Sequence, residues 1–347
     1  MQNLNYKTFY RWTRDEYCDI DGAVAQEELH GHDVTAEDDA GKESLVEVPI
    51  YRPECVGESM AIDEKSIGNN VYTTFTNAET GRIALMCGSL KSSVISTVLT
   101  GFGEGVLRNV KSVTRDFSTS FEAVLGKTFP SAMQTVDKFH AVKELMTDLQ
   151  AFRISLKSKE LKRYTQERKK HAKLYAEDQK KPKSEQSLKK VYHPALLPNG
   201  ETTAELLHRS RYLLYKRPID WSPQQAERAK LLFSIFPELC KAYMQATEFR
   251  DWYVGNTSDS RDGKEHLLKL WLKDVLETPY SPLKAFANTV KANWDYLLNY
   301  FVGHHTNAIA ESTNAQIQIA AIKNRGARDS DFFFYRISHF LNPVTSK

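Results

Sequence analysis

Residues 113–143 read VTRDFSTSFEAVLGKTFPSAMQTVDKFHAVK, and this stretch decides the fold. Its start completes a β-branched, apolar run over 110–116 that ends in an acid. Residues 118–130 then offer a capping serine, a helical spacing of apolar residues and a proline stop. A second strand-like run follows over 133–140. The stretch therefore predicts a strand, a helix and a further strand.

The preceding segment predicts three more strands. SMAID, VYTTFT and RIALMCG are apolar or β-rich runs within residues 59–88, and the turn-forming NAETG separates the last two. Residues 90–107 have a spacing closer to that of a helix, weakened by glycines. The resulting order β-β-β-α-β-α-β predicts an α/β fold, a mixed sheet with helices packed on it.

The rest of the chain predicts helices. Residues 141–192 are helical and strongly charged, and a loop interrupts them near 180–187. In the next block Ser222 can cap a helix whose first position is Pro223. Two helices follow in 263–303, and a last one is expected over 307–322. A long, mostly helical insertion therefore follows the β-rich start.

The near-neutral net charge of +3 conceals an uneven distribution. Residues 1–60 hold five basic residues against fourteen acidic ones, a net of −9, whereas residues 151–190 hold fourteen against five, a net of +9. Such asymmetry suggests a polyanionic partner, although a solvated helix face gives the same pattern. The 41% hydrophobic content excludes a mainly disordered chain, and no apolar run is long enough for a membrane span.

Two acids stand where apolar strands stop. Asp63 ends MAID, and Asp116 ends SVTRD. If these strands are neighbours in one sheet, both carboxylates project at the same edge, where they would suit Mg²⁺, which prefers oxygen ligands. An acid at a strand end is, however, more often simply a turn residue.

A third acid lies in the predicted last helix. Asn307 and Asn314 stand four residues before and three residues after Glu311, so the three side chains share one helix face. An Asn–Glu–Asn stripe suits a metal ligand with hydrogen-bonding neighbours. A solvent-exposed polar stripe is the alternative interpretation.

Taken in order, these segments resemble a known family. AIDE (61–64), the 113–143 stretch, RYLLYKRPIDWSPQQAERAKLLFSIFPELCKAY (211–243) and TNAIAESTNAQIQ (306–318) resemble the bacterial insertion-sequence DDE transposases of the IS L-three type. The resemblance implies an RNase H-like catalytic core interrupted by a long all-helical insertion. The expected organisation is an acidic N-terminal appendage (1–58), a first core part (59–140), the insertion (141–303) and a last core part (304–347).

The resemblance also implies the site. Asp63, Asp116 and Glu311 match the three catalytic, metal-binding acids of the family. Asp137 is the rival for the second position, and His140 of the same DKFH motif would contact DNA, position the second acid or serve the structure alone. Asp116 is preferred because the fourth strand of this fold lies beside the first. Asn307 and Asn314 would support Glu311.

The implied reaction is Mg²⁺-dependent cleavage and strand transfer at the ends of an insertion sequence, with Mn²⁺ as a substitute for Mg²⁺. The expected partners are element-end and target DNA and further copies of the chain, with no membrane contact, in the bacterial cytoplasm and at the nucleoid during activity. The candidate contacts to phosphates are Lys169, Lys170, Lys323, Arg325 and Arg328. An RNase H-like nuclease or resolvase, and a non-catalytic DNA-binding protein on the same core, are the alternatives.

The first 58 residues depart from the family pattern. Full-length relatives carry a zinc-ribbon and helix-turn-helix region there, whereas this segment is acidic and has no CxxC pair. A negative segment is poorly suited to bind DNA. A separate DNA-recognition protein is therefore an expected partner.

Overall fold

The computed structural model describes residues 33–37, 41–254, 260–279, 281–303, 308–323 and 330–341. The chain forms two compact units. The first joins residues 1–141 to residues 293–347, and the second is the intervening segment 142–292. A helical segment is thus inserted into a unit whose two parts are distant in sequence.

The first unit is built on a mixed six-stranded sheet with the strand order β3-β6-β5-β4-β7-β8. β4, β7 and β8 are parallel, and β3, β6, β5 and β4 pair antiparallel. The parallel half is reached through crossovers that include helices, as parallel strands require. The strands are β3 (Ile50–Tyr51), β4 (Ser59–Ile67), β5 (Asn70–Asn77), β6 (Ile83–Cys87), β7 (Ser112–Arg115) and β8 (Met133–Val136).

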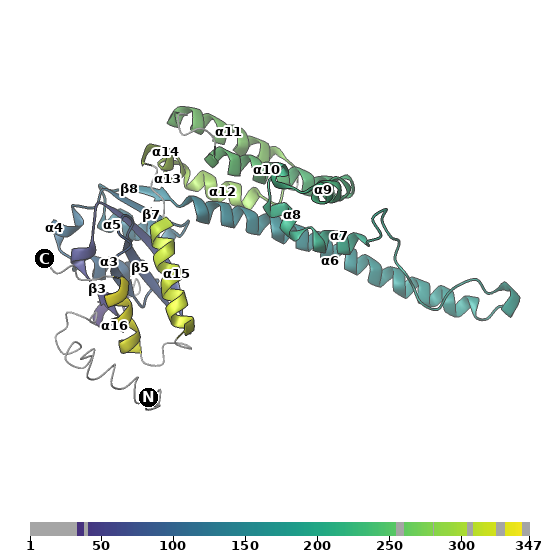
Figure 1. Ribbon diagram of the computed structural model, residues 1–347, viewed down its shortest axis with the longest axis horizontal. Helices are drawn as coiled ribbons and strands as arrows, with labels where there is room; N and C mark the ends of the chain where they lie inside the picture. The colour runs from purple at the N-terminus through teal and green to yellow at the C-terminus, as the bar shows by residue number, and fades with distance from the viewer. Residues whose placement is uncertain are drawn as a thin grey trace, which may run out of the picture. The chain divides into compact units, whose positions relative to one another are not determined.

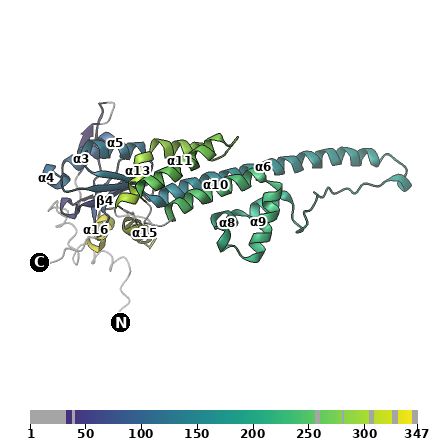
Figure 2. The ribbon, with the colours of Figure 1, turned by 90° about the horizontal axis from the view of Figure 1, so that it is seen from above.

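Helices cover both faces of this sheet (Figures 1 and 2). α3 (Ser92–Thr100) and α5 (Thr119–Thr128) pack on one face, where their apolar residues join Met60, Ile62 and Phe75 in one core cluster. α15 (Ala308–Lys323) and α16 (Ser330–Leu341) pack on the other, against Ile67 and Tyr72. Because successive strand residues face opposite ways, β4 directs Ile62 toward α3 and α5, and Asp63 toward α15.

Part of the acidic N-terminal segment contributes to this core. β1 (Val34–Glu37) and β2 (Glu43–Val46) form a hairpin, and β3 pairs with β6 at the edge of the main sheet. Ala36, Val46 and Val48 are buried in the cluster beneath α3. Acidic residues thus alternate here with apolar ones that pack against the sheet.

The second strand of the deciding stretch is shorter than its sequence suggests. A strand over 133–140 is wrong beyond Val136, because α6 (Lys138–Asp178) begins two residues later. Asp137 ends the strand and caps the helix, since its side chain accepts a hydrogen bond from the backbone N–H of His140 (3.2 Å). The DKFH motif therefore forms a strand-to-helix junction.

The second unit is helical throughout its regular structure in the described residues. Its core is aromatic: the Phe249 ring lies 4.8 Å from that of Trp271 and 5.0 Å from that of Phe286, centroid to centroid. The expected cap at Ser222 is confirmed as a full capping box. After α6 the helices are α7 (Thr203–Arg209), α8 (Arg211–Tyr215), α9 (Pro223–Ile235), α10 (Pro237–Val254), α11 (Arg261–Glu277) and α12 (Lys284–Ala292).

The return to the first unit is also helical. α13 (Trp294–Leu298) and α14 (Tyr300–Gly303) follow the insertion, and the helix expected near 307–322 is confirmed as α15. A short α4 (Glu104–Leu107) completes the elements of the first unit. This architecture, a mixed-sheet core interrupted by helices, is the predicted RNase H-like class.

Candidate active site

Three aspartates form a row across the parallel strands. The ladder pairs Ala61 with Thr114 and Thr114 with Thr135. Two residues further along each strand, on the same face, stand Asp63, Asp116 and Asp137. The hydrogen bond from the Asp137 N–H to the Arg115 carbonyl (2.8 Å) continues this register beyond the strands. The sheet thus places three carboxyl groups at one edge, on the face that α15 covers.

Asp63 is held by a residue of α15. The Asn314 side chain donates a hydrogen bond from Nδ2 to Asp63 Oδ2 (2.8 Å), and the Glu64 backbone N–H donates to Asp63 Oδ1 (2.8 Å). Only the amide nitrogen of Asn314 can donate, so its Oδ1 points elsewhere, and that buried atom has no hydrogen-bond partner. The Glu64 side chain is exposed on the other face.

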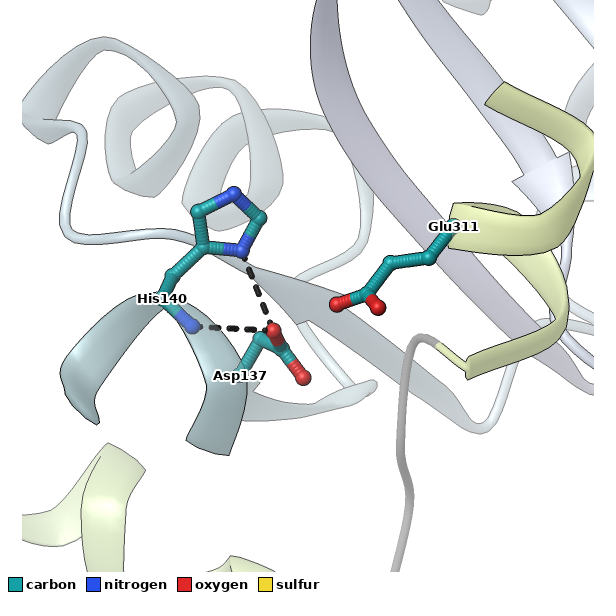
Figure 3. A group of neighbouring side chains, drawn as sticks. All are labelled: Asp137, His140 and Glu311. Atoms are coloured by element: carbon teal, nitrogen blue, oxygen red, sulfur yellow. Dashed lines mark hydrogen bonds and ion pairs between the residues drawn. The ribbon is translucent and has the colours of Figure 1, made fainter. Parts of the chain in front are cut away.

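Asp137 and His140 form a second pair, at the start of α6. The backbone N–H of His140 (3.2 Å) and the ring nitrogen Nδ1 of His140 (3.0 Å) both contact Asp137 Oδ2 (Figure 3). His140 Nε2 lies 3.9 Å from Asp63 Oδ1. The imidazole therefore lies between two of the aspartates, and Asp137 fixes its orientation.

Glu311 approaches the same place from α15. One ligand atom each of Asp137, His140 and Glu311 lies within 4.8 Å of the others. Asp63 and Asn314 line a pocket of about 480 Å³ together with His140 and Glu311. Of the predicted Asn–Glu–Asn face, Glu311 and Asn314 thus converge on the site, and Asn307 lies outside the described residues.

Two contacts seat α15 against the sheet. Thr313 Oγ1 donates to the Gly81 carbonyl (3.0 Å), and Ile317 is fully buried in the cluster on that face. Gly81 has φ +75°, and an added Cβ would lie 2.9 Å from Thr313 Oγ1. The turn between β5 and β6 therefore needs glycine for its conformation and for the close approach of the helix.

The acids disfavour one another's charge. Burial raises the pKa of Asp63; the His140 charge and the Glu64 N–H oppose this, and the charges of Asp116 and Asp137 add to it. Burial likewise raises the pKa of Glu311, as do the Asp137 and Asp63 charges and a hydrogen bond to Asp137, whereas His140 lowers it. The Asp137 hydrogen bond raises the pKa of His140 despite burial. The cluster thus holds more negative charge than His140 offsets.

Asp116 stands beside this cluster rather than inside its closest group. Its Oδ1 accepts a hydrogen bond from the Ser118 N–H (2.8 Å), which fixes the turn into α5. Its charge contributes to the raised pKa of both Asp63 and His140, so it lies within electrostatic reach of them. The structure therefore brings Asp137, the rival second acid, closest to Glu311, and places Asp116 between Asp63 and Asp137 in the row.

The fully buried Arg115 connects the row of aspartates to neighbouring segments of the first unit. Arg115 donates from Nη1 to the Asp116 carbonyl (2.8 Å) and from Nη2 to Asn293 Oδ1 (3.1 Å), and its guanidinium lies 3.3 Å from a Glu122 carboxylate oxygen. The Tyr296 ring lies 4.7 Å from the guanidinium carbon. Arg115 therefore joins the end of β7 to the segment that returns from the insertion.

The donor set suits a hard divalent cation. Carboxylate oxygens from Asp63, Asp116, Asp137 and Glu311 gather on one face, and oxygen is the ligand that Mg²⁺ and Mn²⁺ prefer. The raised pKa values of Asp63 and Glu311 and the unpartnered Asn314 Oδ1 also fit, because a cation and its water would satisfy each of them. The acidic site can therefore hold a divalent metal.

The candidate DNA-contacting residues are only partly described. Lys169 and Lys170 are exposed on α6. Lys323 is the last residue of α15, with its side chain outside the described part, and Arg325 and Arg328 lie wholly outside it.

Five residues that line the pocket were not predicted from the sequence: Lys65, Phe139, Ala315, Gln318 and Ile319. Lys65 lies two residues after Asp63 and so faces the same side of β4, and the exposed Phe139 lies between Asp137 and His140 in the chain. The two-residue period of a strand could have identified Lys65. The exposure of Phe139 follows only from the early start of α6.

An acidic edge of this kind on an RNase H-like sheet, completed by a late helix, defines a class of nucleic-acid-processing enzymes. The family model of the IS L-three-type DDE transposases matches residues 60–337, which is most of the chain. The protein belongs to this transposase family, whose members act on DNA. No curated protein and no solved structure matches the chain.

The match begins at β4 and ends in α16, so it includes the sheet from β4 on, the insertion and α15. In the described part of the chain, none of the helices is both long and apolar enough to cross a membrane.

Proposed function

We propose that this transposase cuts DNA at the ends of an insertion sequence and joins the freed 3′-OH to target DNA, with Mg²⁺ as cofactor and Mn²⁺ as a substitute. The observation that carries the proposal is the gathering of Asp63, Asp116, Asp137 and Glu311 on one face of the sheet edge. Membership in the family supplies the substrate class.

Asp63, Asp116 and Glu311 are proposed as the catalytic acids and metal ligands. When bound, a pair of divalent ions would stabilise the attacking and leaving oxygens of an in-line displacement at phosphorus. Asn314 keeps Asp63 in place through its 2.8 Å hydrogen bond. Only one carboxylate oxygen of Asp116 accepts the Ser118 hydrogen bond, and Asp116 lies on the same face as Asp63. The other oxygen can therefore serve as a metal ligand.

Asp137 is proposed as a positioning residue. Its Oδ2 already accepts two hydrogen bonds, one from the first turn of α6 and one shared with His140. Because these two hydrogen bonds fix its position, the Asp137 carboxylate can move less than the Asp116 carboxylate when a substrate binds. His140, held between Asp137 and Asp63, is suited to donate a hydrogen bond to a DNA phosphate or to Asp63.

DNA contacts outside the acidic pocket are assigned to basic residues. Lys169 and Lys170 on α6 would contact phosphates without reading sequence, as would Lys323, Arg325 and Arg328 after the acidic helix. Action on two ends and a target requires several copies of the chain on DNA. A separate DNA-recognition protein would select the ends, because the N-terminal segment is acidic.

The roles of the acids can be tested with isosteric amides. Asp63→Asn, Asp116→Asn and Glu311→Gln should each lower Mg²⁺-dependent cleavage by roughly 10³-fold or more, because groups that act as a unit fail together. Salt-sensitive DNA binding should remain. Glu64→Gln is the matched control, since Glu64 follows Asp63 and faces away. Full cleavage by the Asp63 or Glu311 variant would refute the proposal.

Two further results refine the assignment. Asp137→Asn should lose activity less severely than Asp116→Asn, and the reverse ranking would make Asp137 the second catalytic acid.

Joining of a 3′-OH end to target DNA separates a transposase from an RNase H-like nuclease or resolvase, which cuts without joining.

A further inference from the structure

Phe139 is an aromatic side chain in an unusual place. It lies in the first turn of α6, and 55% of its surface is exposed. Its ring contacts that of His140 edge-on, with the centroids 5.8 Å apart. One exposed apolar residue needs no explanation by itself. Phe139, however, lines the pocket that contains Asp63 and Glu311.

A second exposed apolar residue lines the same pocket. Ile319 on α15 is 50% exposed and lies two turns after Glu311. Phe139 and Ile319 come from different elements, so the pocket has apolar surface on both of the helices that border it. Exposed apolar groups beside half-buried carboxylates indicate a ligand that is itself partly apolar and partly charged.

Lys65 adds a cation to the pocket. It follows Asp63 by two residues on β4, faces the same side, and lines the pocket half-buried. The pocket therefore offers carboxylates for a metal, an ammonium group for an anion, and apolar faces for a flat ring. Its volume of about 480 Å³ falls in the range of roughly 300–1,000 Å³ typical of small-ligand sites.

A single nucleotide has this combination of groups. Its phosphate can meet the metal and Lys65, and its base offers a π-face for stacking on an aromatic ring. In duplex DNA that face is covered by neighbouring bases, so only an unstacked nucleotide can present it. We propose that the pocket holds an unpaired nucleotide beside the scissile phosphate, with its base against Phe139 and Ile319 and its phosphate near Lys65. This inference rests on the proposed function.

Cleavage of paired and pre-opened DNA tests the proposal. The substrates are two duplexes that carry an end of the insertion sequence, one fully paired and one with mismatched bases at the cleavage site. Phe139→Ala should cleave the paired duplex roughly 10–100-fold more slowly, because stacking on one aromatic ring has about that effect. Mismatches should restore most of the rate, and Phe139→Trp should keep it on both substrates.

The matched control is Ile322→Ala. Ile322 is 67% exposed on α15, does not line the pocket, and should leave both rates unchanged. If Phe139→Ala cleaves paired DNA at the wild-type rate, or loses rate equally on both duplexes, the nucleotide site is overturned while the proposed function stands. Cleavage by Asp63→Asn, in contrast, would refute the function itself.

A photocrosslink locates the base directly. The mismatched duplex with 5-iodouracil at the opened position, bound in Ca²⁺, should crosslink to the peptide of residues 139–143 that trypsin releases after Lys138. The Phe139→Leu variant should lose this crosslink and still bind the DNA. A crosslink confined to α6 beyond residue 150, or to no peptide of the pocket, would overturn the proposal.

Discussion

Two carboxylate sites of this protein, one buried and one half-buried, are held in opposite ways. In the helical unit, Glu201 accepts hydrogen bonds from Arg209 (2.7 Å) and Arg228 (2.9 and 3.0 Å). Burial raises the pKa of Glu201, but the two arginines outweigh it, and the pKa lies below its ordinary value. In the sheet unit, partial burial raises the pKa values of Asp63 and Glu311, and neighbouring carboxylates raise them further.

The difference separates a carboxylate that is neutralised within the chain from a cluster that can take a ligand. The chain supplies its own cations to Glu201, which therefore needs nothing from outside. At the sheet edge His140 offsets part of the charge, and the rest is left for a ligand. Like charges that are partly removed from water reduce stability, so the sheet edge gives up folding free energy at a place that can hold a cation.

The largest expected effect concerns the packing of α15, which carries Glu311, against the sheet. Glu311 reaches the sheet from α15, which packs closely on Gly81, so Gly81→Ala should lower the free energy of unfolding by about 3 kcal/mol through backbone strain and overpacking. Urea unfolding measures it. Gly68→Ala is the control, because Gly68 has φ +62° and nothing within 4 Å of an added Cβ, so only about 1 kcal/mol of strain is expected.

The contact can be separated from the strain with a second substitution. Thr313→Ala in the Gly81→Ala background removes the atom that lies 2.9 Å from the added Cβ and should restore part of the loss. Equal losses for Gly81→Ala and Gly68→Ala would show that α15 does not depend on this turn.

Matched amide substitutions should separate the two carboxylate sites. Glu201→Gln leaves Arg209 and Arg228 without their anion and should lower the free energy of unfolding by about 2 kcal/mol. Glu311→Gln removes a repelling charge and should leave the metal-free protein equally or more stable. Denaturant titration of both variants checks this, and a loss of the same size in Glu311→Gln would remove the distinction.

A divalent cation should stabilise one site alone. At a tenfold excess over its dissociation constant, Mg²⁺ or Mn²⁺ should raise the free energy of unfolding by about 1.4 kcal/mol. Calorimetry should show a corresponding increase in Tm when the metal is added to the wild type or to Glu201→Gln. Asp63→Asn should show no such increase. A rise that persists in Asp63→Asn would place the metal elsewhere.

The smallest effect is in the pH dependence of the metal-free protein. Since the folded pKa of Glu311 lies above its ordinary 4.5, the folded state keeps a proton longer than the unfolded one, and stability falls as pH rises above 4.5. The folded pKa of Glu201 lies below 4.5, so its contribution is present above 4.5 and is lost as pH falls below it.

The two amide variants should therefore change the slope on opposite sides of pH 4.5. Glu311→Gln should flatten the fall above it, and Glu201→Gln should flatten the loss below it. The free energy of unfolding should be measured from below pH 4.5 to above it. If both variants changed the slope on the same side of pH 4.5, the two carboxylate sites would not differ as described.

Much of the sheet could be predicted from local sequence patterns. The apolar or β-rich runs SMAID (59–63), VYTTFT (71–76) and RIALMCG (82–88) predicted β4, β5 and β6, and such runs need no tertiary information. Residues 133–140 were harder, because Asp137 both ends β8 and caps α6. The pairing of Ile50–Tyr51 with β6 depends on contacts distant in sequence, which an acidic local composition conceals.

The site was predictable as residue types and not as an arrangement. The ends of apolar runs and a helix face indicated Asp63, Asp116 and Glu311, but the prediction that a strand ends at Asp63 is wrong, because β4 continues to Ile67 through its pairing with β5. Only the fold brings Asp137 and His140 closest to Glu311. The role of Asn314 depends on its hydrogen bond to Asp63, a partner 251 residues away. Exposure of Phe139 and burial of Arg115 are likewise properties of packing, which no local pattern specifies.

The order of these residues along the chain has a consequence during protein synthesis. All three aspartates of the row leave the ribosome before the insertion, whereas Glu311 and Asn314 come after it. At about 5–20 residues per second, the 174 residues from Lys138 to Glu311 take roughly 10–35 s to make. For that time the nascent protein has a row of acids without the helix that completes it. A product truncated before α15 therefore carries the row of aspartates without Glu311 and Asn314.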